Sequence, residues 1–549
     1  MRRPGWLDAE SAPLGRRELC WMAGLFALAL ALRALGLRLG LPYFHHWDEV
    51  LITGSARAML ERGTDVPTNY FYGAPLMRLT ALGWKLAHAL HLPQLGAPYA
   101  DEVSLRWVAR VVAATISSTG AVGAYLAARW ALGSPRAAAF AGLAFAVAAE
   151  LVWHGRYGVT DTSVVALSTL SLAFAAGYLS RRTLALGALS VSFAGLAFGF
   201  KLTGLATVVL PLSALSLAEP AGLWRAGDLR AERLGLAHRA LLGLTAPLVL
   251  LVFLATNPHV RDDWRTALSH IEGITRHYRQ GHVKPFAERE PGLAHLASAL
   301  WYVLADAFHT RPWASLSFSV PGALGVALAL RRRRAAVALG LAHALAVVVA
   351  MAWPNRAYLT RMYLPALPVL CVGLGLAIDE ALSLAERRWT GSWLRAAPWA
   401  LAVAMASGSV RDAVGCHRMR QDPRVLALDL VAARVPPGGR ARVALSRAVA
   451  GGIALGGHRA VRAYLARPGV ELVGDVASAA EAQALGPDFV VLASHRDAGK
   501  IWPYEEAWEV REVTGYRELA RFGPSPYEER FDQQPTWDGR VTAVVLARE

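Results

Sequence analysis

The chain contains about eleven predominantly apolar runs, most of them long enough to cross a membrane as helices, since a span needs roughly 20 such residues. With 54% hydrophobic and only 18% charged residues over 549 positions, it is too apolar for a soluble globular protein. The sequence therefore predicts a polytopic α-helical membrane protein. The expected spans are 21–41, 106–128, 137–152, 162–179, 183–200, 202–217, 240–256, 314–330, 335–352, 362–382 and 396–410.

Arginine clusters lie in alternate connections between these runs, which is the positive-inside pattern and accounts for the net charge of +16. The pattern predicts a cytoplasmic amino terminus and an extracytoplasmic carboxyl terminus. A cleaved signal peptide is the alternative for the first run, but Arg33 and Arg38 toward its end are unlike a cleavage region. The run 331–334, RRRR, is interpreted as a topology signal, so no nucleic-acid partner is expected.

The part of the chain after about Arg418 is less hydrophobic and predicts a small soluble α/β domain on the extracytoplasmic side. Expected strands are 442–446, 470–474, 489–493 and 542–547, and expected helices are 423–435 and 477–485. The string GGIALGG lacks the spacing of a dinucleotide fingerprint and is interpreted as turns. We expect a membrane domain at 1–417 and this domain at 418–549.

The connections on the expected outer side carry the chemically diverse residues. Asp48 and Glu49 follow the first span, where a carboxylate near the bilayer can act as a general base. The runs 52–62 and 76–90 predict two helices lying in the membrane interface above such a site. The short loop WHGRYGVTD supplies Arg156, Tyr157 and Asp161, although Asp161 could equally cap the next helix.

Two cations complete this set at the ends of apolar runs. Lys201 in FGFKLTG either extends to the interface or holds a phosphate, and Arg361 is the better cation candidate in WPNRAYLTRMYLPALP. Acids, cations and aromatic residues on one side favour a substrate with a lipid end and an anionic sugar end. A polyprenyl-phosphate sugar has both.

Several motifs, in this order, resemble the GT-C glycosyltransferases, the group with the protein O-mannosyltransferases and the lipid A aminoarabinose transferases. They are HHWDE with NYFYGAPLMRLTALGWKL, then RYGVTDT, FGFKLTGL, the loop NPHVRDDWRTALSHIEGITRHYRQGH, and RMYLPALP. The resemblance covers most of the membrane part and implies inverting sugar transfer from a polyprenyl phosphate to an extracytoplasmic protein, lipid or glycan. It implies that the membrane domain is catalytic and that the protein lies in the bacterial inner or plasma membrane.

The resemblance also implies roles for individual residues. Asp48 is the expected base with Glu49 beside it, and Asp161 orients the acceptor or supports the base. Lys201 and Arg361 are the expected phosphate ligands, and Tyr72 of NYFYGAP is an expected substrate contact. The chain departs from several relatives by lacking a lysine before Pro75, which weakens the phosphate assignments.

Other interpretations remain open from the sequence. His45 and His46 either contact sugar or phosphate or, with Asp48 and Glu49, hold a divalent metal; no other cofactor is expected. Tyr278 and His282 either line the acceptor entrance or pack the loop. Cys20, Cys371 and Cys416 form no metal motif. A transporter or flippase, which predicts an inverted repeat and mid-bilayer charges, and an assembly subunit are the competing functional classes.

Overall fold

The computed structural model describes residues 13–38, 41, 46–68, 70, 72–91, 101–218, 229–281, 288–309, 311–389, 394, 396–418, 423–446, 449, 467–476, 478–495, 513–522 and 541–549. The chain forms two compact units. The first comprises Met1–Ala34, Ala58–Thr80 and Ala109–Ala413, and the second Leu35–Arg57, Ala81–Val108 and Val414–Glu549. The division expected at 417/418 stays a prediction, since the second unit also includes two earlier segments.

Up to Arg434, the named elements of the described residues are helices. They are α1 (Arg16–Ala34), α2 (Trp47–Arg62), α3 (Ala74–Ala89), α4 (Asp101–Leu132), α5 (Pro135–Val147), α6 (Ala149–His154), α7 (Asp161–Arg181), α8 (Leu184–Phe200), η1 (Leu202–Val208), α9 (Val209–Ala218), α10 (Leu229–Thr256), α11 (Pro258–Asp262), α12 (Trp264–Gln280), α13 (Leu293–Ala305), α14 (Pro312–Arg331), α15 (Ala335–Ala352), η3 (Thr360–Ala366), α16 (Leu367–Arg388), α17 (Ala397–Arg418) and α18 (Pro423–Arg434).

Within the described residues, six helices are long and apolar enough to cross a membrane, and the chain is an integral membrane protein. They are Val103–Leu132, Asp161–Arg181, Gly235–Thr256, Pro312–Arg331, Ala335–Ala352 and Thr360–Arg388. The other predicted spans also coincide with helices, but these are shorter, broken or more polar. The predicted number of eleven spans and the predicted orientation stay predictions.

Three predicted spans are not single α-helices. The span 137–152 is broken at Ala148, whose ψ of 120° ends α5 before α6 begins. The spans 202–217 and 362–382 both begin as 3₁₀ helices, and the second contains Pro365 in its 3₁₀ part. A further apolar helix, α13, lies in the stretch 257–313 that the sequence predicted to be a long loop. Breaks of this kind bring polar backbone to the interior of a bundle, where function can use it.

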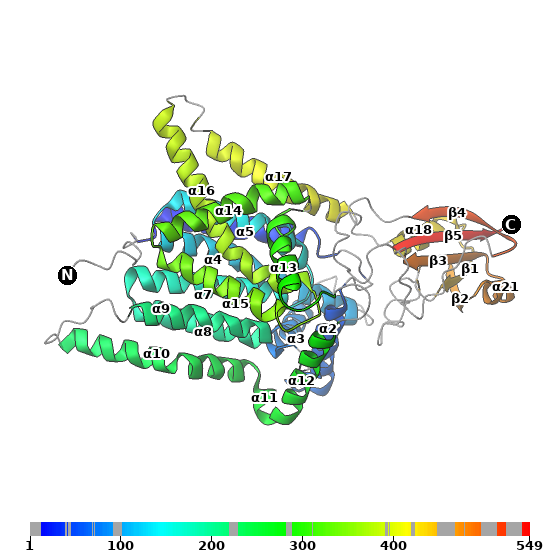
Figure 1. Ribbon diagram of the computed structural model, residues 1–549. Coiled ribbons are helices and arrows are strands. Elements are labelled where there is room, and N and C mark those ends of the chain that lie inside the picture. Colours follow the sequence, from blue (N-terminus) through cyan, green and yellow to red (C-terminus); the bar gives the residue numbers. More distant parts are fainter. Residues whose placement is uncertain are drawn as a thin grey trace. The chain divides into compact units, whose positions relative to one another are not determined.

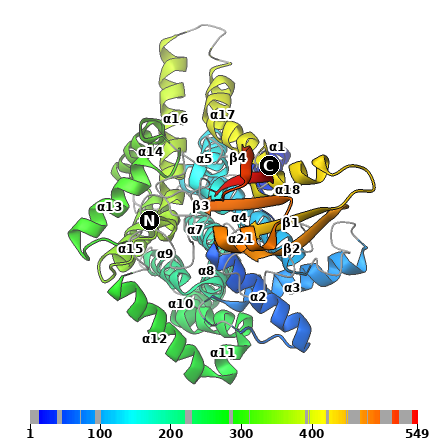
Figure 2. The same ribbon diagram turned by 90° about the vertical axis from the view of Figure 1, so that its right-hand side faces the viewer.

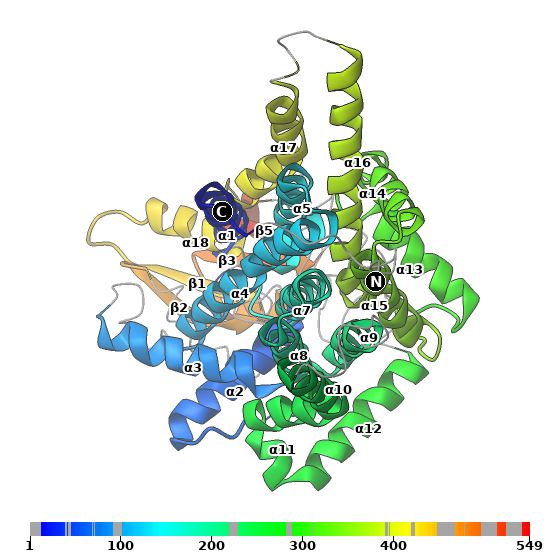
Figure 3. The ribbon, with the colours of Figure 1, turned by 90° about the vertical axis from the view of Figure 1, so that its left-hand side faces the viewer.

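The helices of the first unit pack side by side (Figure 1), and α8 lies against both α7 and α10 when they are seen end-on (Figure 3). Helix α16 packs against α5 on one side and α14 on another. The α14–α16 contact is a close backbone approach, since a Cβ at Gly325 would lie 1.8 Å from the Gly373 carbonyl oxygen. Small residues at such contacts are typical of helix packing in membranes.

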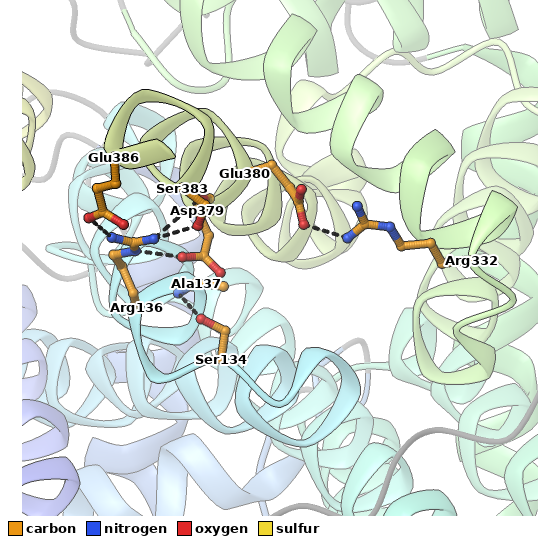
Figure 4. Close-up of polar contacts among 8 residues, drawn as sticks. All are labelled: Ser134, Arg136, Ala137, Arg332, Asp379, Glu380, Ser383 and Glu386. Carbon is orange, nitrogen blue, oxygen red and sulfur yellow. Dashed lines mark hydrogen bonds and ion pairs between the residues drawn. The ribbon is translucent and has the colours of Figure 1, made fainter. Parts of the chain in front are cut away.

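Ion pairs join the same helices at the ends that carry the arginine clusters. The Arg136 guanidinium, at the start of α5, donates to Asp379, Glu386 and the Ser383 hydroxyl of α16 (Figure 4). Arg332, just after α14, pairs with Glu380. These arginines therefore link helices in addition to any role in topology.

The carboxyl-terminal part folds as a five-stranded sheet in the order β2-β1-β3-β5-β4, whose strands are all labelled in Figure 1 and are seen from another side in Figure 2. Strands β1 (Ala441–Ser446), β2 (Val470–Val476) and β3 (Phe489–His495) run parallel, and β4 (Tyr516–Phe522) and β5 (Val541–Arg548) pair antiparallel. Helix α18 covers one face and α21 (Ala479–Leu485) the other. The four predicted strands and both predicted helices are present, whereas β4 was not predicted.

Candidate active site

Asp161, Lys201 and Arg361 come together as a buried ion-pair cluster in the first unit. The Lys201 Nζ donates to Asp161 Oδ1 at 2.7 Å, and the Arg361 Nε lies 3.7 Å from Asp161 Oδ2. The side chains of Asp161 and Lys201 are 3% and 7% exposed, and that of Arg361 is 16% exposed. The structure thus brings together three residues that the sequence could only place at the ends of three separate apolar runs.

Interruptions in the helices position the two cations. Lys201 ends α8 in an extended conformation, with φ −159° and ψ 143°, and the 3₁₀ helix η1 follows it. Arg361 is the second residue of η3, directly before α16. Because both residues lie where an α-helix is interrupted, their charged ends reach the bundle interior instead of lipid.

Asp161 does not cap α7 with its side chain. The N-cap position belongs to Thr160, and Asp161 lies in the first helical turn. Its carboxylate is therefore near the positive end of the helix dipole, on the same side as the two cations. The simple capping role that the sequence left open is replaced by the ion pair.

Tyr72 lies beside this cluster, with Lys201 Nζ 5.5 Å from its ring centroid. The neighbouring backbone is fixed to the end of α8, because the Gly73 N–H donates to the Phe200 carbonyl at 3.1 Å. The Asn257 side chain joins both segments by accepting from the Ala74 N–H at 2.7 Å and donating to the Gly199 carbonyl at 3.1 Å. Tyr72 therefore presents an aromatic face at a fixed distance from a cation.

The close approach of these backbones explains the residues that precede Pro75. A Cβ on Gly73 would lie 1.6 Å from the Gly199 carbonyl oxygen, and Ala74 is fully buried. A lysine side chain has no room at position 73. The packing here therefore accounts for the absence of the lysine that the related motif has before its proline. Lys201 is the cation that the structure offers beside Tyr72.

Asp48 and Glu49 belong to the second unit, where they form the first turn of α2 and are buried. His46 caps this helix, because its Nδ1 accepts the Asp48 N–H at 3.2 Å. The same nitrogen is 3.9 Å from Asp48 Oδ2. A neutral imidazole that accepts at Nδ1 carries its proton on Nε2.

The metal alternative gains no geometric support from the described part of the chain. No group of three His, Cys, Asp or Glu residues there is arranged to hold an ion. His45, one of the proposed ligands, lies outside the described residues.

Arg156 and Tyr157 are both buried in the turn between α6 and α7. The Arg156 guanidinium lies 4.8 Å from the Trp153 ring centroid, and that of Arg110 lies 5.6 Å from the Tyr157 ring. These contacts support the turn that leads to Asp161. Direct substrate contacts by Arg156 and Tyr157 stay predictions.

A second buried polar cluster was missed by sequence reasoning. Glu150 Oε2 accepts from the Tyr302 hydroxyl at 2.7 Å and is 3.3 Å from His154 Nε2. Burial, together with the smaller effect of the Glu150 charge, raises the pKa of the nearby Asp306 carboxyl to about 6. The sequence signal for this cluster was the carboxylate of Glu150 inside the predicted span 137–152, because acidic residues within membrane spans usually have a function.

Of the two expected entrance residues, Tyr278 lies beside the segment 355–363, which carries Arg361. The Tyr278 carbonyl, near the end of α12, accepts from the N–H groups of Arg356 at 2.9 Å and Ala357 at 3.0 Å. His282 lies outside the described residues. Tyr278 is thus seen to hold this segment through its backbone, and its role toward an acceptor stays a prediction.

The chain matches no protein-family model and no curated protein. Its structure is similar to ArnT from Cupriavidus metallidurans bound to undecaprenyl phosphate, at 17% identity and a TM-score of 0.45 over 96% of this chain and 98% of that chain. It is also similar to the archaeal oligosaccharyltransferase AglB from Archaeoglobus fulgidus in complex with an inhibitory peptide and a dolichol-phosphate. That similarity has 14% identity and a TM-score of 0.48, and it covers 87% of this chain and 69% of that chain.

A third similarity is to the S. cerevisiae protein O-mannosyltransferase Pmt1-Pmt2 complex bound to the sugar donor, at 17% identity and a TM-score of 0.36. It covers 45% of this chain and 34% of that chain. By its name this complex belongs to one of the groups whose motifs the sequence resembles.

Proposed function

We propose that the chain is a membrane glycosyltransferase that moves a sugar from a polyprenyl phosphate to an extracytoplasmic acceptor. The observation that carries the proposal is the convergence of Lys201 and Arg361 on the buried Asp161 carboxylate. Cations fixed inside a membrane protein suit a phosphate that arrives on a lipid, since a buried charge is costly without a partner or a function.

The proposed reaction uses three side chains: Asp48 as the base, and Lys201 and Arg361 as the phosphate ligands. The acceptor hydroxyl attacks the anomeric carbon from the face opposite the phosphate, and Asp48 takes its proton. The bond between that carbon and the phosphate oxygen breaks, and its electron pair stays on the oxygen, so the lipid phosphate leaves with an added negative charge. Lys201 and Arg361 stabilise that charge as it develops in the transition state. Attack from the opposite face inverts the anomeric configuration.

Tyr72 and Asp161 have supporting roles in this proposal. The Tyr72 ring, next to Lys201, offers an apolar face for the sugar. Asp161 holds the two cations in place before the donor arrives, which avoids reorganisation during the reaction. Inversion, the roles of these residues and the extracytoplasmic position of the site are parts of the proposal.

A transporter is the second candidate, because one feature favours it. Lys201 lies at a helix interruption and Arg361 in a 3₁₀ segment, and discontinuous helices hold substrates in many transporters. A transporter would move a lipid-linked sugar across the bilayer and leave its glycosidic bond intact.

Reconstituted protein assayed with a panel of polyprenyl-phosphate sugars separates these functions. We expect Asp48→Asn to lower the transfer rate at least roughly 100-fold, the smaller end of the range for loss of a general base, while donor binding is retained. Asp65→Asn is the matched control: its carboxylate is 84% exposed, and we expect the rate to stay within about twofold.

Full transfer by Asp48→Asn would show that Asp48 is not the base. Movement of the intact lipid-linked sugar between leaflets, without transfer to any acceptor, would show that the protein is a transporter and not a glycosyltransferase.

A further inference from the structure

His295 in α13 is fully buried and makes two hydrogen bonds to the segment 355–363. Its Nδ1 is 2.8 Å from the Asn355 carbonyl oxygen, at the start of the segment. Its Nε2 is 2.5 Å from the Tyr363 hydroxyl, at the end of the segment. Arg361 lies between these two attachment points.

The partners determine the protonation of the ring. A carbonyl oxygen can only accept, so the proton of a neutral His295 is on Nδ1 and points at Asn355. Nε2 then has a lone pair and accepts from the Tyr363 hydroxyl. Burial lowers the pKa of His295, as does the nearby Arg289, so this neutral form is the one present at neutral pH.

Other bonds hold the first half of the same segment. The Tyr358 hydroxyl donates to the Ser298 carbonyl of α13 at 3.1 Å, and the Tyr278 carbonyl binds the N–H groups of Arg356 and Ala357. From Thr360 onward the η3 turn follows, and Tyr363 is its buried polar anchor to α13. The His295–Tyr363 bond therefore restrains the half of the segment that contains Arg361.

Packing alone gives no reason for a histidine at this position. Helix α13 is otherwise almost wholly apolar, and a buried imidazole costs free energy unless both nitrogens are bonded. Both are bonded here, and to the two ends of one segment.

We infer that His295 is a positioning residue for Arg361, a bracket that fixes η3 so that the guanidinium stays beside Asp161. The inference rests on the proposed function in one respect, that Arg361 meets the donor phosphate. The bracket itself is a property of the protein without donor.

The test compares His295→Asn and Tyr363→Phe with the control His343→Asn. The asparagine amide keeps a donor for Asn355 and loses the acceptor for Tyr363, so His295→Asn and Tyr363→Phe remove the same bond from opposite sides. His343 is also a buried histidine, in α15, and lies outside the segment. The first measurement is amide hydrogen exchange by mass spectrometry on the protein without ligand.

We expect faster exchange at 359–366 in both bracket variants and no change there in His343→Asn. The second measurement is transfer kinetics: the donor KM should rise roughly tenfold, as for loss of one buried hydrogen bond, with the acceptor KM unchanged. The double variant His295→Asn/Tyr363→Phe should be no worse than the poorer single variant within about twofold, because both changes remove one interaction.

Unchanged exchange at 359–366 in His295→Asn would overturn the bracket, whatever the enzyme transfers. Faster exchange together with equal rises in the donor KM and the acceptor KM would show that His295 has a structural role only. Absence of donor binding by the wild-type protein would instead count against the proposed function, with the exchange result still deciding the bracket.

Discussion

Asp161 and Lys201 illustrate how a buried charge depends on its partner. Each is almost inaccessible to water, and each compensates the desolvation of the other at 2.7 Å. Removing one partner of such a pair leaves an uncompensated charge, whereas removing both is often close to neutral for stability. A stability measurement can therefore separate the structural part of this pair from its proposed role with phosphate.

We expect Lys201→Met to lower the free energy of unfolding by about 3–5 kcal/mol, and Asp161→Asn/Lys201→Met to recover a large part of that loss. Thermal unfolding in detergent measures the change. Neither variant should regain transfer, because the cation for the phosphate is missing from both. A double variant that recovers activity together with stability would contradict the proposed role of Lys201.

Asp306 predicts a pH dependence of stability. Its pKa rises from about 3.9 in the unfolded chain to about 6 in the folded protein, so the folded state binds more protons between these values. Stability contributed by the protonated group is present below about pH 4 and is lost as pH rises to about 6. His259 acts in the opposite sense, because burial, with a smaller effect of the nearby Arg78, lowers its pKa to about 4.

Asp306→Asn should remove the Asp306 contribution alone. We expect the difference in melting temperature between Asp306→Asn and the wild type to become more favourable to the variant as pH rises from 4 to 6. A difference that does not change over this window would show that Asp306 titrates normally.

At the scale of elements, the segment 72–74 and the end of α8 are joined by the Gly73–Phe200 backbone hydrogen bond and by the Asn257 side chain. Gly73 has no space for a side chain, since its Cβ would meet a carbonyl oxygen rather than a flexible group. The contact cannot relax without moving Tyr72 away from Lys201. Sequence reasoning identified Tyr72 and Lys201 separately, and the backbone contact is what relates them.

Gly73→Ala should therefore lower donor affinity and stability together, by roughly 1–3 kcal/mol in unfolding free energy, as for overpacking. Gly273→Ala in α12 is the matched control, because nothing lies within 4 Å of its Cβ. That control should stabilise the helix by up to about 1 kcal/mol. Equal effects of Gly73→Ala and Gly273→Ala on donor affinity would show that the contact between Gly73 and the end of α8 does not position Tyr72 for the donor.

At the scale of the whole molecule, the orientation in the membrane is a prediction from arginine distribution. The cluster at Arg387 and Arg388 is expected on the cytoplasmic side, and the connection containing Asp65 on the outer side. Arg136 and Arg332 already have partners on α16, so their positions are also explained by helix packing (Figure 4). Helix packing does not decide which end of the bundle faces the cytoplasm, so the orientation needs an experiment of its own.

In a variant whose three cysteines are replaced by serine, Asp65→Cys and Arg387→Cys provide two exposed probes. A membrane-impermeant thiol reagent should label the first in intact cells and the second only after permeabilisation. The reverse result would invert the predicted topology and move the proposed site to the cytoplasmic face.

The sequence by itself determined the membrane class, the positions of nearly all helices and four of the five strands. These follow from local patterns: apolar runs of sufficient length, and alternation in the short strands. It also selected Asp161, Lys201 and Arg361 by their place at the ends of apolar runs. Helices α11, α12 and α13, all within the stretch predicted to be a loop, were missed because each is shorter than a span, and β4 was missed because its residues alternate little.

Only the tertiary structure decided which of these residues meet. Lys201 pairs with Asp161 across 40 positions, and Tyr363 with His295 across 68, and no local pattern encodes such distances. The break at Ala148 is likewise an outcome of packing, since nothing in its apolar surroundings ends a helix there. Local periodicity fixes where a helix lies along the chain, whereas close backbone approach and charge compensation fix which side chains share a site.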